Sequence, residues 1–354
     1  MKIQRVEAWP VAMRLAEPYT IAYETIDSTV NVFLKIETDT GLCGFGCAAP
    51  DLEVTGETEA TVMQVMDDVV KPQIIGADPL RFASLIGRLR PSMERHPSAL
   101  AAMDMALFDL LGKACGAPVW KMLGGFRDCI PTSITIGILP LPETVSKAGE
   151  FVARGFTSLK IKGGIDVDRD IERVLRVREV VGRQVGLRFD ANQGFSVEQA
   201  VLFATATQST GLEFIEQPTA RENPALLGQV TEASPVPIMA DESLMTVRDA
   251  LDLACRRRAA MINIKLMKVG GISEAQHVDS VARAAGMTSM VGCMDESALA
   301  IAAGLHFALA RPNVVCADLD GHFDLVDDPA AGAVILKDGT LYPHDAPGLG
   351  FSLR

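Results

Sequence analysis

The sequence predicts an α/β protein in which a parallel β/α barrel follows a smaller α+β domain. After about residue 130, short β-rich runs alternate with helix-length stretches, whereas the first 116 residues read as strands followed by helices. Regular βα alternation is typical of a parallel sheet covered by helices, and segregated strands and helices are typical of an α+β unit. A polar residue at the end of every predicted barrel strand indicates where the functional site lies.

The first domain is expected to contain an antiparallel sheet and a group of helices. Residues 30–46 read as two strand-like segments with the turn signal Thr-Asp-Thr-Gly between them. Apolar residues then recur at helical spacing, most clearly over residues 99–111. Gly112 and the sequence Gly-Ala-Pro at 116–118 are expected to end this helix.

The second domain is expected to contain eight barrel strands. They are predicted at residues 131–136, 158–161, 186–189, 212–215, 237–239, 261–264, 288–291 and 314–315. Each strand except the last is followed by a segment long enough for one helix. The resulting domain boundaries are 1–125 for a capping domain, completed by the turn-rich residues 322–354, and 126–321 for the barrel.

Polar residues close every predicted barrel strand. In chain order they are Thr135, Lys160 and Lys162, Asp190 and Asn192, Glu216, Asp241 and Glu242, Lys265, Cys293 to Glu296, and Asp318 and Asp320. Successive groups lie about 25 residues apart, which is the length of one βα unit. They therefore converge on the carboxyl-terminal rim, where barrel enzymes have their active sites. A single acid at such a position is commonly a helix cap, but capping alone does not explain the whole series.

Three of these residues, Asp190, Glu216 and Asp241, are carboxylates on adjacent predicted strands. Converging carboxylates repel one another unless a cation lies among them. Oxygen ligands suit a hard cation such as Mg²⁺, and the lack of histidine at these positions argues against Zn²⁺. The pattern therefore predicts one Mg²⁺ per subunit.

Lys162 and Lys265 are expected on opposite sides of the barrel, flanking the three carboxylates. A lysine of ordinary pKa is a poor base at neutral pH, but a nearby cation and Lys160 would lower the pKa of Lys162. A substrate carboxylate on the metal would present its α-carbon between the two amines. One amine can remove the α-proton and the other can return a proton from the opposite face, which inverts the stereocentre.

The ordered set of motifs resembles the enolase superfamily, in its muconate-lactonizing-enzyme branch. The matching segments are Ala102 to Leu110, Gly124-Gly125, Lys160-Ile161-Lys162, Asp190-Ala191-Asn192-Gln193, Glu216-Gln217-Pro218, Asp241-Glu242-Ser243 and Asn263-Ile264-Lys265. The resemblance covers the whole chain and implies a modified TIM barrel, (β/α)7β, with an N-terminal α+β capping domain. It also implies the following roles: Mg²⁺ ligation by Asp190, Glu216 and Asp241, substrate-carboxylate binding by Lys160, and acid/base catalysis by Lys162 on the R form and Lys265 on the S form.

The last barrel strand distinguishes the activities within this branch. Asp318-Leu319-Asp320 resembles the Asp-x-Asp of dipeptide epimerases, in which the pair receives the N-terminal ammonium group of the substrate. Two carboxylates would repel muconate or a succinyl group and attract an amine. We therefore expect a dipeptide epimerase that inverts the α-carbon of the C-terminal residue of an L,L-dipeptide through an ene-diolate. The alternative is an N-succinylamino acid racemase, an o-succinylbenzoate synthase or a muconate cycloisomerase.

Further acids are predicted around the substrate side chain. In family members acting on Ala-Glu, an arginine in the first capping loop meets the side-chain carboxylate, and Glu24 takes that place in this sequence. Asp51 in the second capping loop and Asp295 after the seventh strand add two acids, and Thr135 and Cys293 complete the expected substrate contacts. This set predicts a preference for cationic dipeptides, unless one or more of these acids points to solvent.

Composition excludes several other classes of protein. With 354 residues, a formal net charge of −12 and 5% aromatic residues, the chain has no basic or aromatic surface for nucleic acid. No apolar run is long enough to span a membrane, and the N-terminus lacks the pattern of a signal peptide. The seven cysteines suit buried, reduced thiols. We therefore expect a cytoplasmic homo-oligomer whose partner is a small dipeptide.

The sequence disfavours two other functions. Glycines follow several predicted strands, but none forms a dinucleotide fingerprint or a phosphate-binding loop, so a dehydrogenase is disfavoured. A binding protein that has lost catalysis is disfavoured because both lysines and all three acids are present.

Overall fold

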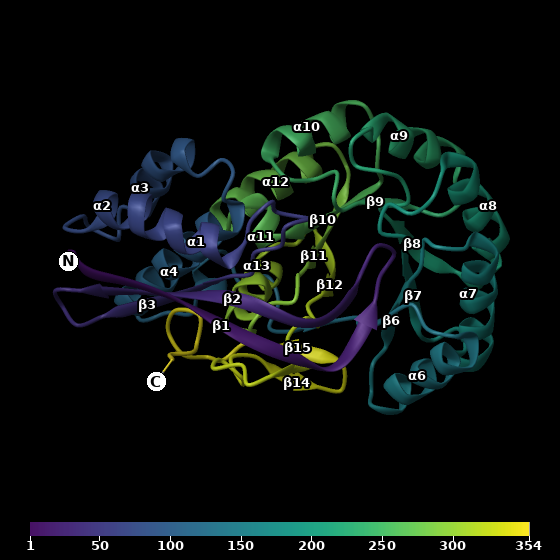
Figure 1. Cartoon of the computed structure of the whole chain (residues 1–354), viewed down its shortest axis with the longest axis horizontal. Coiled ribbons are helices and arrows are strands. Elements are labelled where there is room, and N and C mark those ends of the chain that lie inside the picture. Colours follow the sequence, from purple (N-terminus) through teal and green to yellow (C-terminus); the bar gives the residue numbers. More distant parts are fainter. Residues whose placement is uncertain (354) are drawn as a thin grey trace.

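The computed structural model describes residues 1–353 and contains three β-sheets within them (Figure 1). The largest has eight strands in the order β12-β11-β10-β9-β8-β7-β6-β5, all pairing in parallel. A four-stranded sheet (β13-β1-β2-β3) and a three-stranded sheet (β14-β15-β4) are antiparallel. The predicted combination of an α+β unit and a parallel barrel is confirmed.

The N-terminal sheet consists of β1 (Ile3–Thr20), β2 (Thr25–Thr38) and β3 (Cys43–Ala48). The predicted turn between the second and third strands is present, since the Gly41 amide donates to the Thr38 carbonyl at 3.0 Å and Gly41 has φ of 80°. Strands β1 and β2 form a long hairpin, drawn in purple in Figure 1, which extends from the N-terminal helices across to the barrel.

Helices follow this sheet, as the hydropathy pattern predicts. They are α1 (Glu59–Val65), a π-helical segment (Met66–Val70), α2 (Lys71–Ile74), α3 (Phe82–Leu89), a 3-10 turn (Arg90–Ser92), α4 (Pro97–Cys115) and α5 (Val119–Met122). Helix α4 is apolar on nearly all sides, a pattern typical of a helix buried in a core, and it packs between β3 and the barrel helix α11 (Leu266–Val269).

Helix α4 ends at Gly116, whose left-handed backbone (φ 68°) forms the cap. The prediction that Gly112 also ends the helix is wrong, because the helix continues through it. A Cβ at position 112 would lie 2.6 Å from the Cα of Gly348. Glycine is therefore needed at this position for the close approach of the C-terminal segment.

The barrel strands are β5 (Ile134–Ile136), β6 (Ser158–Lys162), β7 (Gly186–Asp190), β8 (Leu212–Glu216), β9 (Ile238–Ala240), β10 (Met261–Lys265), β11 (Thr288–Gly292) and β12 (Val314–Asp318). The connections between them contain α6 (Leu141–Ala153), α7 (Val167–Val181), α8 (Val197–Thr207) with a 3-10 turn (Gln208–Thr210), α9 (Pro224–Ala233), α10 (Val247–Cys255), α11 with α12 (Ile272–Ala284), and α13 (Ala298–Ala310). Within residues 1–353 no helix follows β12, so the topology is (β/α)7β. Helices α6 to α9 form the outer wall on the side away from α1–α4 (Figure 1).

The predicted first barrel strand, residues 131–136, is wrong as a single element. Its first part, β4 (Ile130–Pro131), pairs with β15 (Thr340–Tyr342) in the small sheet, and only β5 belongs to the barrel. Between them the Thr132 amide donates to Gly339 and the Ser133 amide donates to Ala317. Thr132 and Ala317 also form a parallel bridge, which links the first and last strands of the barrel.

The C-terminal residues return to the N-terminal sheet, as expected. β13 (Leu325–Val326) pairs with β1, and β14 (Ile335–Lys337) pairs with β15. The Leu349 amide donates to the buried Asp109 carboxylate on α4 at 2.9 Å. The boundaries drawn at 125/126 and 321/322 stay a prediction.

Helix α13 is buried on every side. Its His306 accepts a hydrogen bond from the Trp120 amide at 3.2 Å, and burial lowers the pKa of this histidine to about 3, so His306 has a structural role. All seven cysteines are unpaired, but only Cys47 is fully buried. Four are partly buried, and the expected burial is wrong for Cys115 and Cys255, which are exposed. Among the residues described, none of the helices combines the length and apolarity that crossing a membrane requires.

Replacement of Gly112 by alanine should destabilise the fold by about 1–3 kcal/mol, because the new methyl group meets backbone atoms that cannot move aside cheaply. Gly87→Ala on α3 is the matched control. A Cβ there meets nothing within 4 Å, so it should be neutral or stabilise by up to about 1 kcal/mol. Urea unfolding measures both, and equal stabilities of the two variants would contradict this packing.

Candidate active site

Polar side chains gather at the carboxyl-terminal rim of the barrel. Lys162, Asp190, Glu216, Lys265 and Asp318 are each the last residue of a strand. Register places Lys162 beside Asp190 and Asp190 beside Glu216 on neighbouring strands. A cavity above this rim is lined by both predicted base lysines and by the tip of the β1–β2 hairpin.

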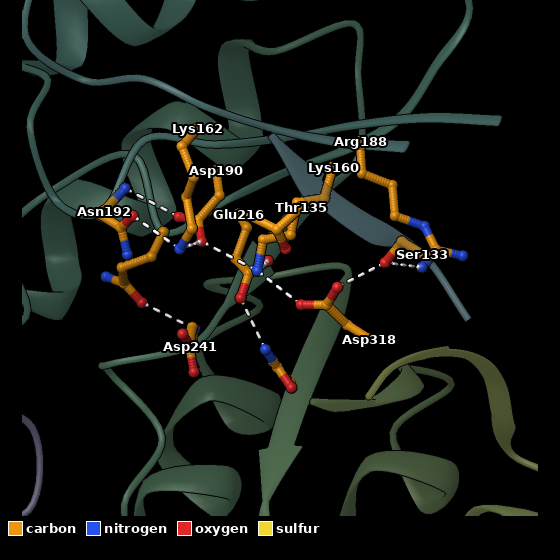
Figure 2. Close-up of polar contacts among 12 residues, drawn as sticks. Ser133, Thr135, Lys160, Lys162, Arg188, Asp190, Asn192, Glu216, Asp241 and Asp318 are labelled. Carbon is orange, nitrogen blue, oxygen red and sulfur yellow. Dashed lines mark hydrogen bonds and ion pairs between the residues drawn. The ribbon is translucent and has the colours of Figure 1, made fainter. Parts of the chain in front are cut away.

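Lys160 lies among carboxylates from three strands (Figure 2). Its ammonium nitrogen is 2.8 Å from Asp318, 2.9 Å from Glu216 and 3.1 Å from Asp190. Lys160 is 2% exposed, so water does not solvate these charges, and the ammonium group and the carboxylates must stabilise one another. Burial acts to lower the pKa of Lys160, but the acids outweigh it and hold this pKa well above its usual value.

Asp241 forms a second buried group with two lysines. Lys265 contacts its carboxylate at 2.9 Å, and the fully buried Lys268 contacts both its carboxylate and its carbonyl oxygen. Burial acts to raise the pKa of Asp241, but the lysines outweigh it and hold this pKa far below its usual value. Lys268 was missed from the sequence. A lysine on a one-turn helix usually reaches solvent, so nothing marked Lys268 except its spacing of three residues from Lys265.

The three predicted metal ligands are therefore held around lysine ammonium groups. Within residues 1–353 no set of acid, histidine or cysteine side chains is already arranged as a metal cluster. The donors nevertheless fit a hard cation, because all are carboxylate oxygens. Oε2 of Glu216 accepts no aligned hydrogen bond from the described residues, although the Lys160 ammonium group lies 2.9 Å from it and now occupies the place of a cation. Burial, together with Asp190 and Asp241, raises the pKa of Glu216 to about 8 against the opposing effect of Lys160 and Lys265.

Lys162 and Lys265 lie on opposite sides of the barrel, since β6 and β10 are four positions apart in the eight-stranded sheet. Lys162 donates to Asp190 at 2.7 Å and to Asn192 at 2.9 Å. Acid neighbours, led by Asp241, outweigh burial and raise the pKa of Lys265 well above its usual value. Both side chains line the cavity, as the two-base arrangement requires.

Asp318 and Asp320 face the same cavity from the end of β12. Asp318 binds Lys160, and the Thr135 amide donates to Asp320 at 2.7 Å. The Cys293 thiol donates weakly to Asp320 at 3.9 Å, so Thr135 and Cys293 lie where the sequence places them. Burial and Asp318 raise the pKa of Asp320 to about 7.

Glu24, Asp51 and Asp295 line the outer part of the cavity. Glu24 is exposed to solvent, whereas Asp51 and Asp295 are partly buried. Partial desolvation raises the pKa of Glu24, with Asp51 adding to the effect, and burial raises the pKa of Asp295 to about 6. The charge of Asp51 raises the pKa of both Glu24 and Asp295, so Asp51 lies close enough to interact electrostatically with each of them. The Asp51 carboxylate also accepts from the Val54 amide at 2.7 Å, which orders its loop.

Tyr19 was missed from the sequence because it belongs to a long strand, β1, that carries no motif. Its hydroxyl donates to Asp295 at 2.9 Å and so ties the hairpin tip to the loop after β11. The hairpin also contacts the segment that follows the first barrel strand, where the Ile138 amide donates to the Thr20 carbonyl. A Cβ at Gly137 would lie 3.0 Å from the Cβ of Tyr19, so a larger residue would push the hairpin away.

Both parts of the chain match models of known protein families. Residues 3–124 match the model of the mandelate racemase/muconate lactonizing enzyme N-terminal domain. Residues 143–354 match the model of the enolase C-terminal domain-like family.

Individual relatives match along their full length. An L-Lys-D/L-Arg epimerase of Desulforapulum autotrophicum is 42% identical over 99% of this chain and 99% of its own. A dipeptide epimerase of Methylococcus capsulatus, solved with Mg and L-Arg-D-Lys, superposes with a TM-score of 0.93 at 38% identity, covering 99% of each chain. A dipeptide epimerase of Enterococcus faecalis, solved with Mg and L-Leu-L-Tyr, gives 0.96 at 38% identity and the same coverage.

The raised pKa of Asp295 makes a testable contribution to stability. Its folded value of about 6 exceeds the ordinary 3.8, so the folded protein binds this proton more tightly than the unfolded chain. Raising the pH from 4 to 6 should therefore reduce the stability of the wild type relative to Asp295→Asn, by roughly 1–2 kcal/mol. Urea unfolding at both pH values tests this, and a pH-independent difference would show that Asp295 titrates normally.

Proposed function

The chain belongs to the mandelate racemase/muconate lactonizing enzyme family of the enolase superfamily, and we propose that it is a Mg²⁺-dependent dipeptide epimerase. One observation carries this proposal beyond the shared fold. Asp318 and Asp320 face the cavity that Lys162 and Lys265 flank from opposite sides. The pair of acids supplies a site for an ammonium group beside a pair of bases.

Asp318 and Asp320 would bind the N-terminal ammonium group of the dipeptide. Two carboxylates attract an amine and repel a second carboxylate, which argues against N-succinylamino acids and muconate as substrates. Thr135 and Cys293 contribute by holding Asp320 toward the cavity. Lys160 would bind the substrate carboxylate, since its ammonium group already lies among oxygen acceptors at the rim.

Asp190, Glu216 and Asp241 are the residues that would hold Mg²⁺. When bound, Mg²⁺ supplies positive charge that stabilises the ene-diolate oxygens and favours the neutral form of nearby lysines. Lys268 and Asn263 position these ligands, because Lys268 contacts Asp241 and the side-chain amide of Asn263 donates to Glu216 at 2.7 Å.

The two lysines would perform the proton transfers. One amine removes the proton from the α-carbon of the C-terminal residue, and the ammonium group on the opposite side donates a proton to the other face. The configuration at this carbon is thereby inverted. The two lysines lie on strands that are four positions apart in the sheet, so each amine acts on a different face of the α-carbon.

Glu24, Asp51 and Asp295 would favour a cationic side chain on the substrate. All three line the cavity, and burial raises the pKa of two of them, so a cation entering this region would relieve their mutual repulsion. The Enterococcus faecalis relative was solved with a hydrophobic dipeptide, so overall similarity alone does not determine this preference. A homo-oligomeric state and a cytoplasmic location stay predictions.

Glu216→Gln should reduce kcat/KM by about 10³-fold, as severely as Lys162→Ala, because both the charge stabilisation and the proton transfer are essential. Calorimetric titration with Mg²⁺ separates the two variants. Glu216→Gln should bind the ion at least ~10-fold more weakly, whereas Lys162→Ala should retain binding. Glu198→Gln on α8 serves as the fully active control. Near-normal activity of Glu216→Gln would contradict the metal assignment.

Side-chain preference is tested with a panel of Ala-Lys, Lys-Arg, Leu-Tyr, Ala-Glu and N-succinyl-lysine. The wild type should epimerise the cationic dipeptides fastest. Glu24→Gln and Asp295→Asn should each lower kcat/KM for Ala-Lys by about tenfold while leaving Leu-Tyr within about twofold. Faster turnover of Ala-Glu than of Ala-Lys would refute the cationic preference, and faster turnover of N-succinyl-lysine would refute the dipeptide assignment.

A further inference from the structure

A chain of hydrogen bonds runs through the barrel interior beneath Asp318 (Figure 2). The Ser133 hydroxyl lies 2.5 Å from Oδ1 of Asp318. Arg188 donates to this hydroxyl at 3.0 Å and to the Ala317 carbonyl at 2.7 Å, and its Nε donates to Glu213 at 2.8 Å. Ser133 is fully buried and Arg188 is 4% exposed, so neither can be paired with bulk water.

Arg188 determines the direction in which the Ser133 hydroxyl donates. A guanidinium group only donates, so the Ser133 oxygen must accept from it and direct its own proton elsewhere. Two acceptors are within reach, Asp318 at 2.5 Å and the Ala317 carbonyl at 3.5 Å. The Ala317 carbonyl already accepts from Arg188, and the carboxylate is the closer and stronger acceptor. The Ser133 proton therefore points to Asp318.

Asp318 needs this support when a substrate is present. Its other cationic partner is Lys160, which contacts Oδ2. In the proposed function Lys160 binds the substrate carboxylate, and Oδ2 is the oxygen left for the substrate ammonium group. The pKa of Asp318 reflects both supports, because burial raises it while Lys160, Ser133 and Arg188 lower it. Arg188 stays charged at every accessible pH, so its support is permanent.

We propose that Ser133 and Arg188 are positioning residues that keep Asp318 ionised and direct its Oδ2 toward the substrate ammonium group. This inference rests on the proposed function. The serine fixes one carboxylate oxygen by a hydrogen bond, and the arginine orients the serine and supplies a positive charge below it. Neither residue contacts the substrate.

The test compares the dipeptide Ala-Lys with propionyl-lysine. Propionyl-lysine is the same molecule except that hydrogen replaces the N-terminal amino group. Ser133→Ala should raise KM for Ala-Lys about tenfold and leave kcat within about twofold, since binding of the ammonium group is weakened and the chemistry is untouched. The preference of kcat/KM for Ala-Lys over propionyl-lysine should fall by about the same factor. A purely structural role would lower both activities together and leave this preference unchanged.

Two further variants keep the test decisive. Ser158→Ala is the matched control, because Ser158 is a buried barrel serine whose hydroxyl has no hydrogen-bond partner among the described residues, and it should leave both KM values unchanged. Ser133→Cys preserves the shape with a weak donor and should raise KM as Ser133→Ala does, even if the alanine variant folds poorly. An unchanged preference in a folded Ser133 variant overturns the inference. Absence of wild-type activity on every dipeptide would instead overturn the proposed function.

Discussion

The active-site rim depends on the compensation of buried negative charge. Four carboxyl groups are nearly inaccessible to water: those of Asp190, Glu216, Asp241 and Asp318. The ionised form of each would be strongly destabilised without a cation beside it. Four lysines supply that charge from strands β6 and β10 and from α11, and each contacts at least one of these acids. The same compensation prepares the site for ligands, because a divalent cation and a substrate ammonium group are other means of balancing these carboxylates.

The barrel converts a repeating sequence pattern into this arrangement. Because parallel strands end at one rim, residues about 25 positions apart in the sequence become neighbours, as Lys162, Asp190 and Glu216 do. The N-terminal sheet then closes the outer side of the cavity. Its hairpin is held at Asp295 by the hydroxyl of Tyr19 and rests on the small residue Gly137. The proposed catalytic residues thus come from the barrel. The acids proposed to contact the substrate side chain come from the N-terminal domain (Glu24 and Asp51) and from the barrel loop after β11 (Asp295).

The sequence was sufficient for the features that recur or that have distinctive chemistry. It predicted the parallel barrel, the antiparallel sheet and the set of rim residues, since strand periodicity and strand-end polarity are local signals. The (β/α)7β form of the barrel followed from the family resemblance. It failed where a distant segment decides the local structure. Gly112 resembles a helix stop, yet it is required by packing against Gly348. Residues 131–136 do not form one strand because β15 pairs with Ile130 and Pro131, which separates Pro131 from the barrel strand. Burial of Lys268 and the link from Arg188 to Asp318 likewise depend on contacts between elements far apart in the chain.

The central claim is that two amines act on opposite faces of one carbon, and exchange of the α-proton in D₂O tests it most directly. In the presence of Mg²⁺, Lys162→Ala should still exchange the α-proton of the L,L-dipeptide through Lys265, without inversion. Lys265→Ala should exchange only the L,D-epimer, through Lys162. Exchange of the same single epimer by both variants, or inversion by either one, would contradict the account.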